Sequence, residues 1–456
     1  MSDNQLLSVL QSGTTQDKID ALQEVLFEKL EDAVLEEVAN YLVDEDKGIR
    51  NSVQNILINN PSSANYIVKY ISSDDISVRN LAGEVLVRIG NESVESLVKY
   101  LSDSDDYDDQ KFIIDVLGLI GDPSVSPKVI EELKKNTDDN VKLACIETLG
   151  NLRDASSVEE LMAAYRQNEL FKPSVIEALG KIGSTEAAGF METVYAEEDV
   201  LTKYSIIESL GLIGNENTFF FLISQLNETS GPLVWPIIKS IQQLKEQYNL
   251  EVPFDEKIKS VILDTIYEAQ PEFKKAAIFL LSQFNDKEMI SAFLNSVGED
   301  EELDIMIRGT LLENVEKTLS VYPSLLQNEI KNATPVLETL VDLLQNSETP
   351  LEKIYNGLSL RSLIDSLSKY LTHPDEEARR LAMILLFGID AKAAILFADK
   401  MVNDDNIWNK LKLIENLAEL DDEGVTPILE KLAEDSEIMV SKRASDLLNQ
   451  RSSIYN

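Results

Sequence analysis

The sequence predicts an all-α protein, built as a solenoid of about fourteen short helical hairpins. A glycine-containing motif recurs along the chain at a nearly constant interval. Its first full copy is Leu117-Gly118-Leu119-Ile120-Gly121-Asp122, and its counterparts begin at Leu149, Leu179 and Leu210. Their leading glycines are 32, 30 and 31 residues apart, and residues 86–91 keep the same register one period earlier. Apolar residues between the motifs recur at helical spacing. A helix pair this short has no core of its own, so neighbouring pairs must stack to form one.

Each repeat is predicted to contain two helices. The first follows an Asp-rich turn, as at Asp74-Asp75, where a carboxylate caps free backbone N–H groups and favours the positive end of the helix dipole. Its apolar stripe contains Val78, Leu81, Ala82, Val85, Leu86 and Ile89. A glycine then ends the helix because it adopts the left-handed conformation at little cost. The second helix, residues 93–100, carries its own stripe of Val94, Leu97 and Val98, continued by Leu101.

The motif residues resemble the HEAT repeat, in the short form of phycobilin-lyase-type HEAT-like proteins. The matching pattern is Asp-x-x-Val-Arg, then Ala, then Leu-Gly-x-Ile-Gly-Asp, and its best copies cover residues 44–226, with others at 373–402 and 403–433. The resemblance implies a right-handed, armadillo-like α-α superhelix. It also implies a concave binding surface, which we expect the second helix of each repeat to line. The motif consists of packing residues, so it says little about function.

The periodicity divides the chain into four predicted parts. These are N-terminal capping helices at 1–43, regular HEAT-like repeats at 44–244, an irregular helical middle region at 245–350, and C-terminal HEAT-like repeats at 351–456. The register breaks at 245–256, where a longer connection ending in Pro253 follows the last regular repeat. The regular pattern returns near His373.

The charge balance restricts the class of partner. The chain has 41 basic and 81 acidic residues, for a net charge of -40. This excess disfavours nucleic acid and anionic membrane surfaces, both of which reward Lys and Arg. A protein partner with a basic or mixed-charge surface is compatible with it. The N-terminus has no basic and apolar signal segment, and the longest apolar runs are too short to cross a bilayer, so we expect a cytoplasmic protein.

No constellation for catalysis, cofactor binding or metal binding is predicted, and we expect no enzyme. The single cysteine, Cys145, lies on an apolar helical stripe and is predicted to be core. The single histidine, His373, is predicted to lie in an inter-repeat turn, and any site that needs two imidazoles is excluded. The Asp-rich segment 103–109 begins like a calcium loop but has Asp108 where Gly is needed and Ile114 in place of the final Glu.

The leading hypothesis is therefore a non-catalytic scaffold or adaptor that binds a protein along its concave face. The candidate residues lie at outward positions of second helices and are Glu95, Lys99, Lys128, Glu131, Glu132, Glu159 and Glu160. The alternative is a lyase or chaperone-like subunit of the phycobilin-lyase HEAT type, acting on a bound cofactor or client protein. A visible chromophore or a deep apolar pocket with converging polar groups would favour that alternative.

Two further sets of side chains have structural interpretations. Tyr165 and Tyr195 occupy equivalent repeat positions and are predicted to be core, as are Trp235 and Trp408. An acid stands four residues before a base at several helix starts, as at Asp375 and Arg379, and is predicted to form i,i+4 ion pairs on one helix. The HEAT resemblance implies that such residues also form ladders between repeats.

Overall fold

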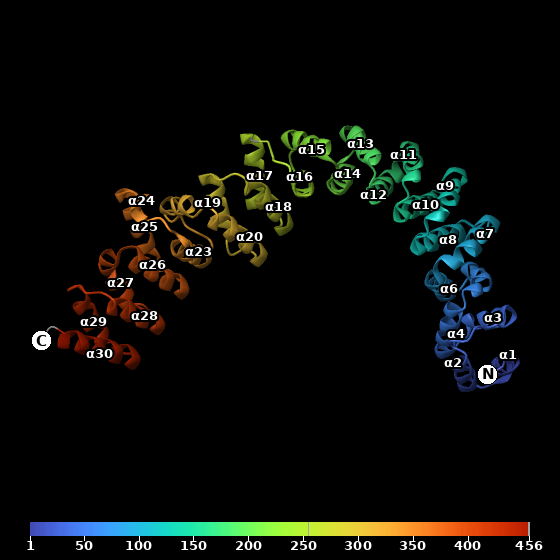
Figure 1. The fold of residues 1–456 in the computed structure, drawn as a ribbon, viewed down its shortest axis with the longest axis horizontal. Coiled ribbons are helices and arrows are strands. Elements are labelled where there is room, and N and C mark those ends of the chain that lie inside the picture. The colour runs from blue at the N-terminus through green and yellow to red at the C-terminus, as the bar shows by residue number, and fades with distance from the viewer. Residues whose placement is uncertain (254, 455–456) are drawn as a thin grey trace. The chain divides into compact units, whose positions relative to one another are not determined.

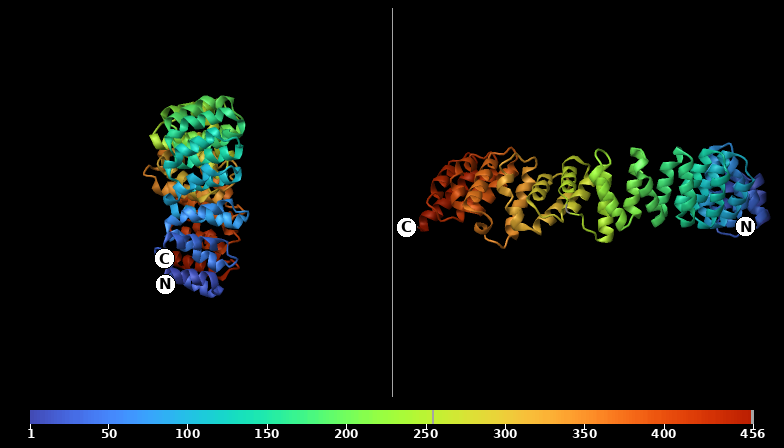
Figure 2. Two further views of the ribbon diagram at one scale, coloured as in Figure 1. Left: turned by 90° about the vertical axis from the view of Figure 1, so that its right-hand side faces the viewer. Right: turned by 90° about the horizontal axis from the view of Figure 1, so that it is seen from above.

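The computed structural model describes residues 1–253 and 255–454, and within those ranges every regular element is a helix. The all-α solenoid prediction is therefore confirmed. The chain forms two compact units, Met1–Glu251 (unit 1) and Val252–Asn456 (unit 2). Successive helices stack in sequence order within each unit (Figures 1 and 2). None of the described helices combines the length and apolarity needed to cross a bilayer.

Unit 1 has two layers, and Figure 1 shows one layer on the concave side of this unit's arc and the other on its convex side. We call the concave-side helices the inner helices. They are α2 (Thr15–Glu24), α4 (Lys47–Asn59), α6 (Ile76–Ile89), α8 (Tyr107–Ile120), α10 (Asp139–Leu152), α12 (Lys172–Ile182), α14 (Val200–Ile213) and α16 (Val234–Tyr248).

The convex-side helices, or outer helices, are α1 (Asp3–Ser12), α3 (Asp32–Ala39), α5 (Ala64–Ile67), α7 (Val94–Asp103), α9 (Ser126–Lys135), α11 (Val158–Gln167), α13 (Thr185–Val194) and α15 (Glu216–Glu228). Short 3₁₀ turns extend or connect the helices of unit 1. They are η1 (Asn40–Val43), η2 (Pro61–Ser63), η3 (Val68–Ser72), η4 (Gly90–Ser93), η5 (Pro123–Val125), η6 (Ala155–Ser157), η7 (Glu169–Phe171) and η8 (Tyr195–Glu197).

The leading glycine of the repeated motif is where neighbouring inner helices of unit 1 meet. The facing pairs are Gly118 and Thr148, Gly150 and Ala178, Gly180 and Ser209, and Gly211 and Ser240. A Cβ at any of these glycines would lie 2.6 or 2.7 Å from an atom of the facing residue, closer than real Cβ atoms approach. The inner helices therefore pack directly on one another from α8 to α16, whereas the outer helices contact each other little.

Hydroxyl groups bridge the same contacts. In three of the four pairs the residue facing the glycine is Ser or Thr, and its hydroxyl donates to the carbonyl four residues before that glycine. The bonds run from Thr148 to Ile114 (3.0 Å), from Ser209 to Ile176 (3.4 Å) and from Ser240 to Ile207 (2.9 Å). Because these hydroxyls are buried, the hydrogen bonds satisfy groups that would otherwise be costly to bury.

Unit 2 stacks helices of less regular length: α23 has 14 residues, whereas α22 has four. Its helices are α17 (Glu256–Glu268), α18 (Pro271–Leu281), α19 (Lys287–Ser296), α20 (Glu301–Leu312), α21 (Val315–Leu319), α22 (Tyr322–Leu325), α23 (Ala333–Asn346), α24 (Leu351–Ile354), α25 (Gly357–Tyr370), α26 (Glu376–Ile395), α27 (Ala398–Val402), α28 (Ile407–Ala418), α29 (Val425–Ala433) and α30 (Ile438–Ile454). The four-part division of the sequence stays a prediction.

Most core assignments are confirmed. Cys145, Tyr165 and Tyr195 are buried, and burial raises the pKa of the Cys145 thiol well above its usual range. His373 lies in the turn before α26, as predicted. The prediction for Trp408 is wrong, because 65% of this residue is exposed at the first turn of α28. It points outward because Asn409, the next residue, takes the buried position and donates to the Glu376 carbonyl.

The predicted i,i+4 pair of Asp375 and Arg379 is replaced by a contact between repeats. Asp375 caps α26 by accepting from the Glu377 N–H with one carboxylate oxygen, and the other oxygen accepts from the Thr334 hydroxyl. The Arg379 guanidinium reaches Asp404 through two hydrogen bonds of 2.9 Å. Lys410 and Asp435 repeat this link one period later, at 2.7 Å. The ladder implied by the resemblance is therefore present here.

We expect Gly150→Ala to lower the thermal unfolding midpoint of the full chain. The new methyl would lie 2.7 Å from the Ala178 Cα, and overpacking of roughly 1–3 kcal/mol should outweigh a helix-propensity gain of about 1 kcal/mol. The matched control is Gly189→Ala in α13, where a Cβ meets nothing within 4 Å and the midpoint should rise. Circular dichroism melts of both variants measure the midpoints. A higher midpoint for both variants would show that the contact between α10 and α12 accommodates a methyl group.

We expect Asp404→Asn to destabilise unit 2 by about 2 kcal/mol near neutral pH, because it removes one charge of a largely buried pair. Burial disfavours the ionised Asp404, but hydrogen bonds from Arg379, the Asn406 N–H and Asn409 outweigh it and lower its pKa. Its contribution is thus complete above the unfolded pKa of about 3.9 and is lost as pH falls through the lower folded value. Melting curves from pH 7 to pH 3 should show the two proteins converging in acid. A constant difference at every pH would contradict the assignment.

Candidate protein-binding face and groove

An acidic residue stands three positions before the motif glycine on each inner helix from α8 to α14, and at the equivalent position of α6. The residues are Glu84, Asp115, Glu147, Glu177 and Glu208, and we call them the inner acidic row. All are exposed except Asp115, which is half-buried. Four residues further on, and hence on the same side of each helix, lie Arg88, Leu119, Asn151, Lys181 and Leu212. Leu119 and Leu212 are 69% and 65% exposed, so the face combines carboxylates with uncovered apolar side chains.

The inner acidic row is only partly neutralised by its own helices. Lys111 pairs with Asp115 and Lys181 with Glu177, both at 2.7 Å. Glu208 accepts from the Tyr204 hydroxyl at 3.1 Å. Glu147 has no hydrogen-bond or ion-pair partner among the residues that the structure describes. Exposed pairs of this kind contribute about 0–1 kcal/mol each, so a partner's cation can replace the internal one at small cost.

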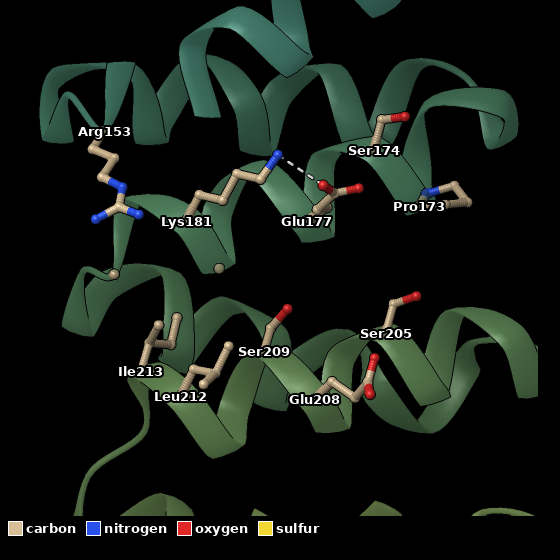
Figure 3. A pocket seen from close by; sticks show the side chains of 12 residues that line it. Arg153, Pro173, Ser174, Glu177, Lys181, Ser205, Glu208, Ser209, Leu212 and Ile213 are labelled. Atoms are coloured by element: carbon tan, nitrogen blue, oxygen red, sulfur yellow. Dashed lines mark ion pairs between the residues drawn. The ribbon is translucent and has the colours of Figure 1, made fainter. Parts of the chain in front are cut away.

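Unit 1 also has a groove of about 650 Å³ on this inner face, between α12 and α14 (Figure 3). Its lining comes from both helices and from the end of α10, and comprises Arg153, Pro173, Ser174, Glu177, Gly180, Lys181, Gly183, Ser205, Glu208, Ser209, Leu212 and Ile213. Figure 3 shows Arg153 and Lys181 toward one end of the groove, with Glu208 and Ser205 nearer the other. Lys181 donates to Asn151 at 3.1 Å and is thereby held in place.

Arg153 stands out by its backbone. It ends α10 with φ 54° and ψ 32°, in the left-handed region, where the ends of α8 and α12 have Gly121 and Gly183. A side chain in this conformation costs about 1 kcal/mol. The Arg153 guanidinium is exposed and makes no ion pair or hydrogen bond within residues 1–253 and 255–454. The chain therefore places an unpaired cation at the groove where its neighbouring repeats use glycine.

The concave placement predicted for seven residues is wrong. Those on α7, α9 and α11 lie in the outer layer, on the convex side of unit 1 (Figure 1): Glu95, Lys99, Lys128, Glu131, Glu132, Glu159 and Glu160. The reason is the motif glycine, which belongs to the first helix of each repeat. It lets the first helices approach closely and so makes theirs the shorter, inner layer. Whether these residues bind a protein is a separate question and stays a prediction.

Glu132 is also wrong as an outward position, because only 1% of it is exposed. Its carboxylate lies between Lys128 and Lys135, at 3.1 and 2.9 Å from their ammonium groups. Hydrogen bonds from the same two lysines lower the pKa of Glu131. The charged groups of Lys128, Glu131, Glu132 and Lys135 therefore pair with one another along α9.

The inner acidic row and Arg153 were missed at the sequence level, although the signals were present. The row keeps a constant distance from the motif glycine, and Arg153 replaces the second glycine of one motif copy. Nothing in the sequence alone places these residues beside one another across five inner helices. No group of His, Cys, Asp and Glu side chains in the described part of the chain is arranged to hold a metal ion.

Stacked helix pairs with a motif-glycine contact define the chain as an α-solenoid, and residues 94–171 match the model of the HEAT-repeat family. Residues 94–171 are therefore HEAT repeats, which confirms the resemblance found in the sequence. No curated protein matches the chain in sequence.

Solved structures similar to the chain include importin beta, the karyopherin Kap121p and a phycocyanin lyase complex. A crystal structure of importin beta aligns with 97% of this chain and 76% of its own, at 12% identity and a TM-score of 0.47. Kap121p aligns with 95% of this chain and 58% of its own, at 10% identity and a TM-score of 0.40. The complex of CpcE and CpcF of phycocyanin lyase from Nostoc sp. PCC7120 aligns with 62% of this chain and 94% of the matched chain, at 16% identity and a TM-score of 0.29. Similarities this distant carry no argument about activity or partner.

We expect Arg153→Gly to raise the unfolding free energy of unit 1 by about 0.5–1 kcal/mol, because glycine adopts the left-handed conformation without strain. Denaturant titration monitored by circular dichroism measures the change. Arg166→Gly, in the last turn of α11, is the control and should destabilise, since glycine there loses helix propensity and the contact of the Arg166 guanidinium with the Phe190 ring. A loss of stability in Arg153→Gly would mean that the guanidinium supports the fold.

Proposed function

We propose that this chain is a non-catalytic scaffold that binds a partner protein on the inner face of unit 1. The observation that carries the proposal is the inner acidic row, a carboxylate at the same position on each of five successive inner helices. A surface with this repeat complements a partner whose basic groups are distributed over a length of several helices. Solenoids provide extended surfaces of this kind because each repeat adds the same positions again.

The partner we propose has a basic or mixed-charge surface with apolar side chains among its cations. Leu119 and Leu212 interrupt the charged positions of the inner face and are exposed, so they provide apolar contact area beside the acidic row. Apolar contacts at the centre with charges around them are the usual arrangement of specific interfaces. The excess negative charge of the chain would also speed the encounter with such a partner at low salt.

The test compares two double variants with the same change in charge. Glu147→Lys with Glu208→Lys alters the inner face and breaks no internal ion pair among the described residues, whereas Glu95→Lys with Glu159→Lys alters the outer helices. A partner captured on the full-length protein and identified by mass spectrometry would be purified for calorimetry. We expect the inner variant to raise the Kd for this partner at least tenfold, or by about 1.4 kcal/mol. The outer variant should raise the Kd less than twofold.

Two outcomes would overturn the proposal. If only the outer variant lost affinity, the partner would bind the convex side, where the seven residues of the original prediction lie. If neither variant changed the Kd at low or high salt, binding would not depend on charged residues of either layer. Circular dichroism of each variant controls for loss of fold.

A further inference from the structure

The groove between α12 and α14 has charges of opposite sign at separate positions along its length. Arg153 and Lys181 lie toward the end where both helices terminate, and Glu208 lies further back on α14 (Figure 3). Leu212, between these charges along α14, is 65% exposed and provides an apolar wall. A ligand that fits this groove must therefore offer a negative group, an apolar group and a positive group in that order.

Only one of the two cations is free to bind such a ligand without giving up an internal partner. Lys181 is held by Glu177 at 2.7 Å and by Asn151 at 3.1 Å. Arg153 has no such contact in the described part of the chain, and its planar guanidinium suits a carboxylate, which it can bind through two parallel hydrogen bonds. Its left-handed backbone is strained, and strain kept at an exposed position without a structural partner points to a binding role.

We propose that this groove binds a short extended segment of the partner protein in which an acidic residue pairs with Arg153 and a nearby basic residue pairs with Glu208. The inference rests on the proposed function, since the groove lies on the inner face of unit 1. An apolar side chain of the same segment lies against Leu212. The segment recognises the groove by charge complementarity at two points and by apolar contact between them.

The geometry sets the spacing of the two charged residues in the segment. Along α14, Glu208 lies five residues before Ile213, the residue at the Arg153 end, and five residues of helix span about 7.5 Å. An extended chain advances about 3.3 Å per residue. The acidic and basic residues are therefore two or three positions apart, with the apolar residue between them. Either chain direction satisfies this pattern.

The experiment is a selection from a displayed library of random heptapeptides on the immobilised full-length protein, followed by fluorescence anisotropy of the enriched peptide. We expect enrichment of an acidic and a basic residue two or three positions apart around an apolar residue. Arg153→Gly should weaken the enriched peptide about tenfold and remove the preference for the acidic residue. Glu208→Gln should remove the preference for the basic residue, and Glu186→Gln on α13, outside the groove, should change neither.

Because Arg153→Gly is expected to stabilise the fold, weaker binding by this variant cannot be attributed to unfolding. Enriched peptides that bind Arg153→Gly and Glu208→Gln as tightly as they bind the unsubstituted protein would overturn the groove assignment. A selection without any enriched pattern would overturn it as well. Neither result bears on the inner-face proposal, which the charge-reversal variants test with the whole partner protein. The two proposals can therefore fail independently of each other.

Discussion

The contact between a motif glycine and a small residue on the next inner helix is the constraint on which unit 1 depends. The contact of Gly150 with Ala178 is the least able to adjust, because a methyl at Gly150 would meet the Ala178 backbone as well as its side chain. Ordinary helix packing separates axes by about 8–10 Å, and a glycine at the crossing point allows the short end of that range. Repeated at four successive contacts, it keeps one layer of helices closer together than the other. The difference between layers makes one face of the unit concave, and the hydroxyls of Thr148, Ser209 and Ser240 fasten the same contacts.

The same constraint arranges the charged residues. A side chain at a fixed distance from the motif glycine falls at the same height on every inner helix, so a repeated sequence position becomes a row in space. The inner acidic row arises in this way. The groove arises where the row meets a departure from the repeat: α12 and α14 touch at Gly180 and Ser209, and Arg153 enters beside them from the end of α10. The regular repeat thus provides the extended acidic face, and Arg153, which departs from the repeat, adds a positive charge to that face at the groove.

The sequence was sufficient for the helices, the stacking order and the burial of Cys145 and Tyr165, because all of these follow from apolar spacing within and between repeats. It was not sufficient to say which layer is concave, since that depends on the distance between helices and not on their amphipathicity. The seven residues on α7, α9 and α11 were misplaced for that reason. The predictions for Glu132 and Trp408 were wrong for a more local reason. Two lysines hold the Glu132 carboxylate in a buried position, and Asn409 takes the buried position next to Trp408. Ion pairs between repeats, such as Arg379 with Asp404, were implied by family resemblance and not by spacing.

Carboxyl footprinting of the full-length protein, alone and in complex with its captured partner, tests the central claim most directly. A water-soluble carbodiimide with an amine labels exposed carboxylates, and peptide mass spectrometry gives the labelling rate at each site. The inner-face account predicts slower labelling of Glu147, Glu177 and Glu208 in the complex, with Glu95, Glu131 and Glu159 unchanged. Protection of the second set with the first unchanged would contradict it.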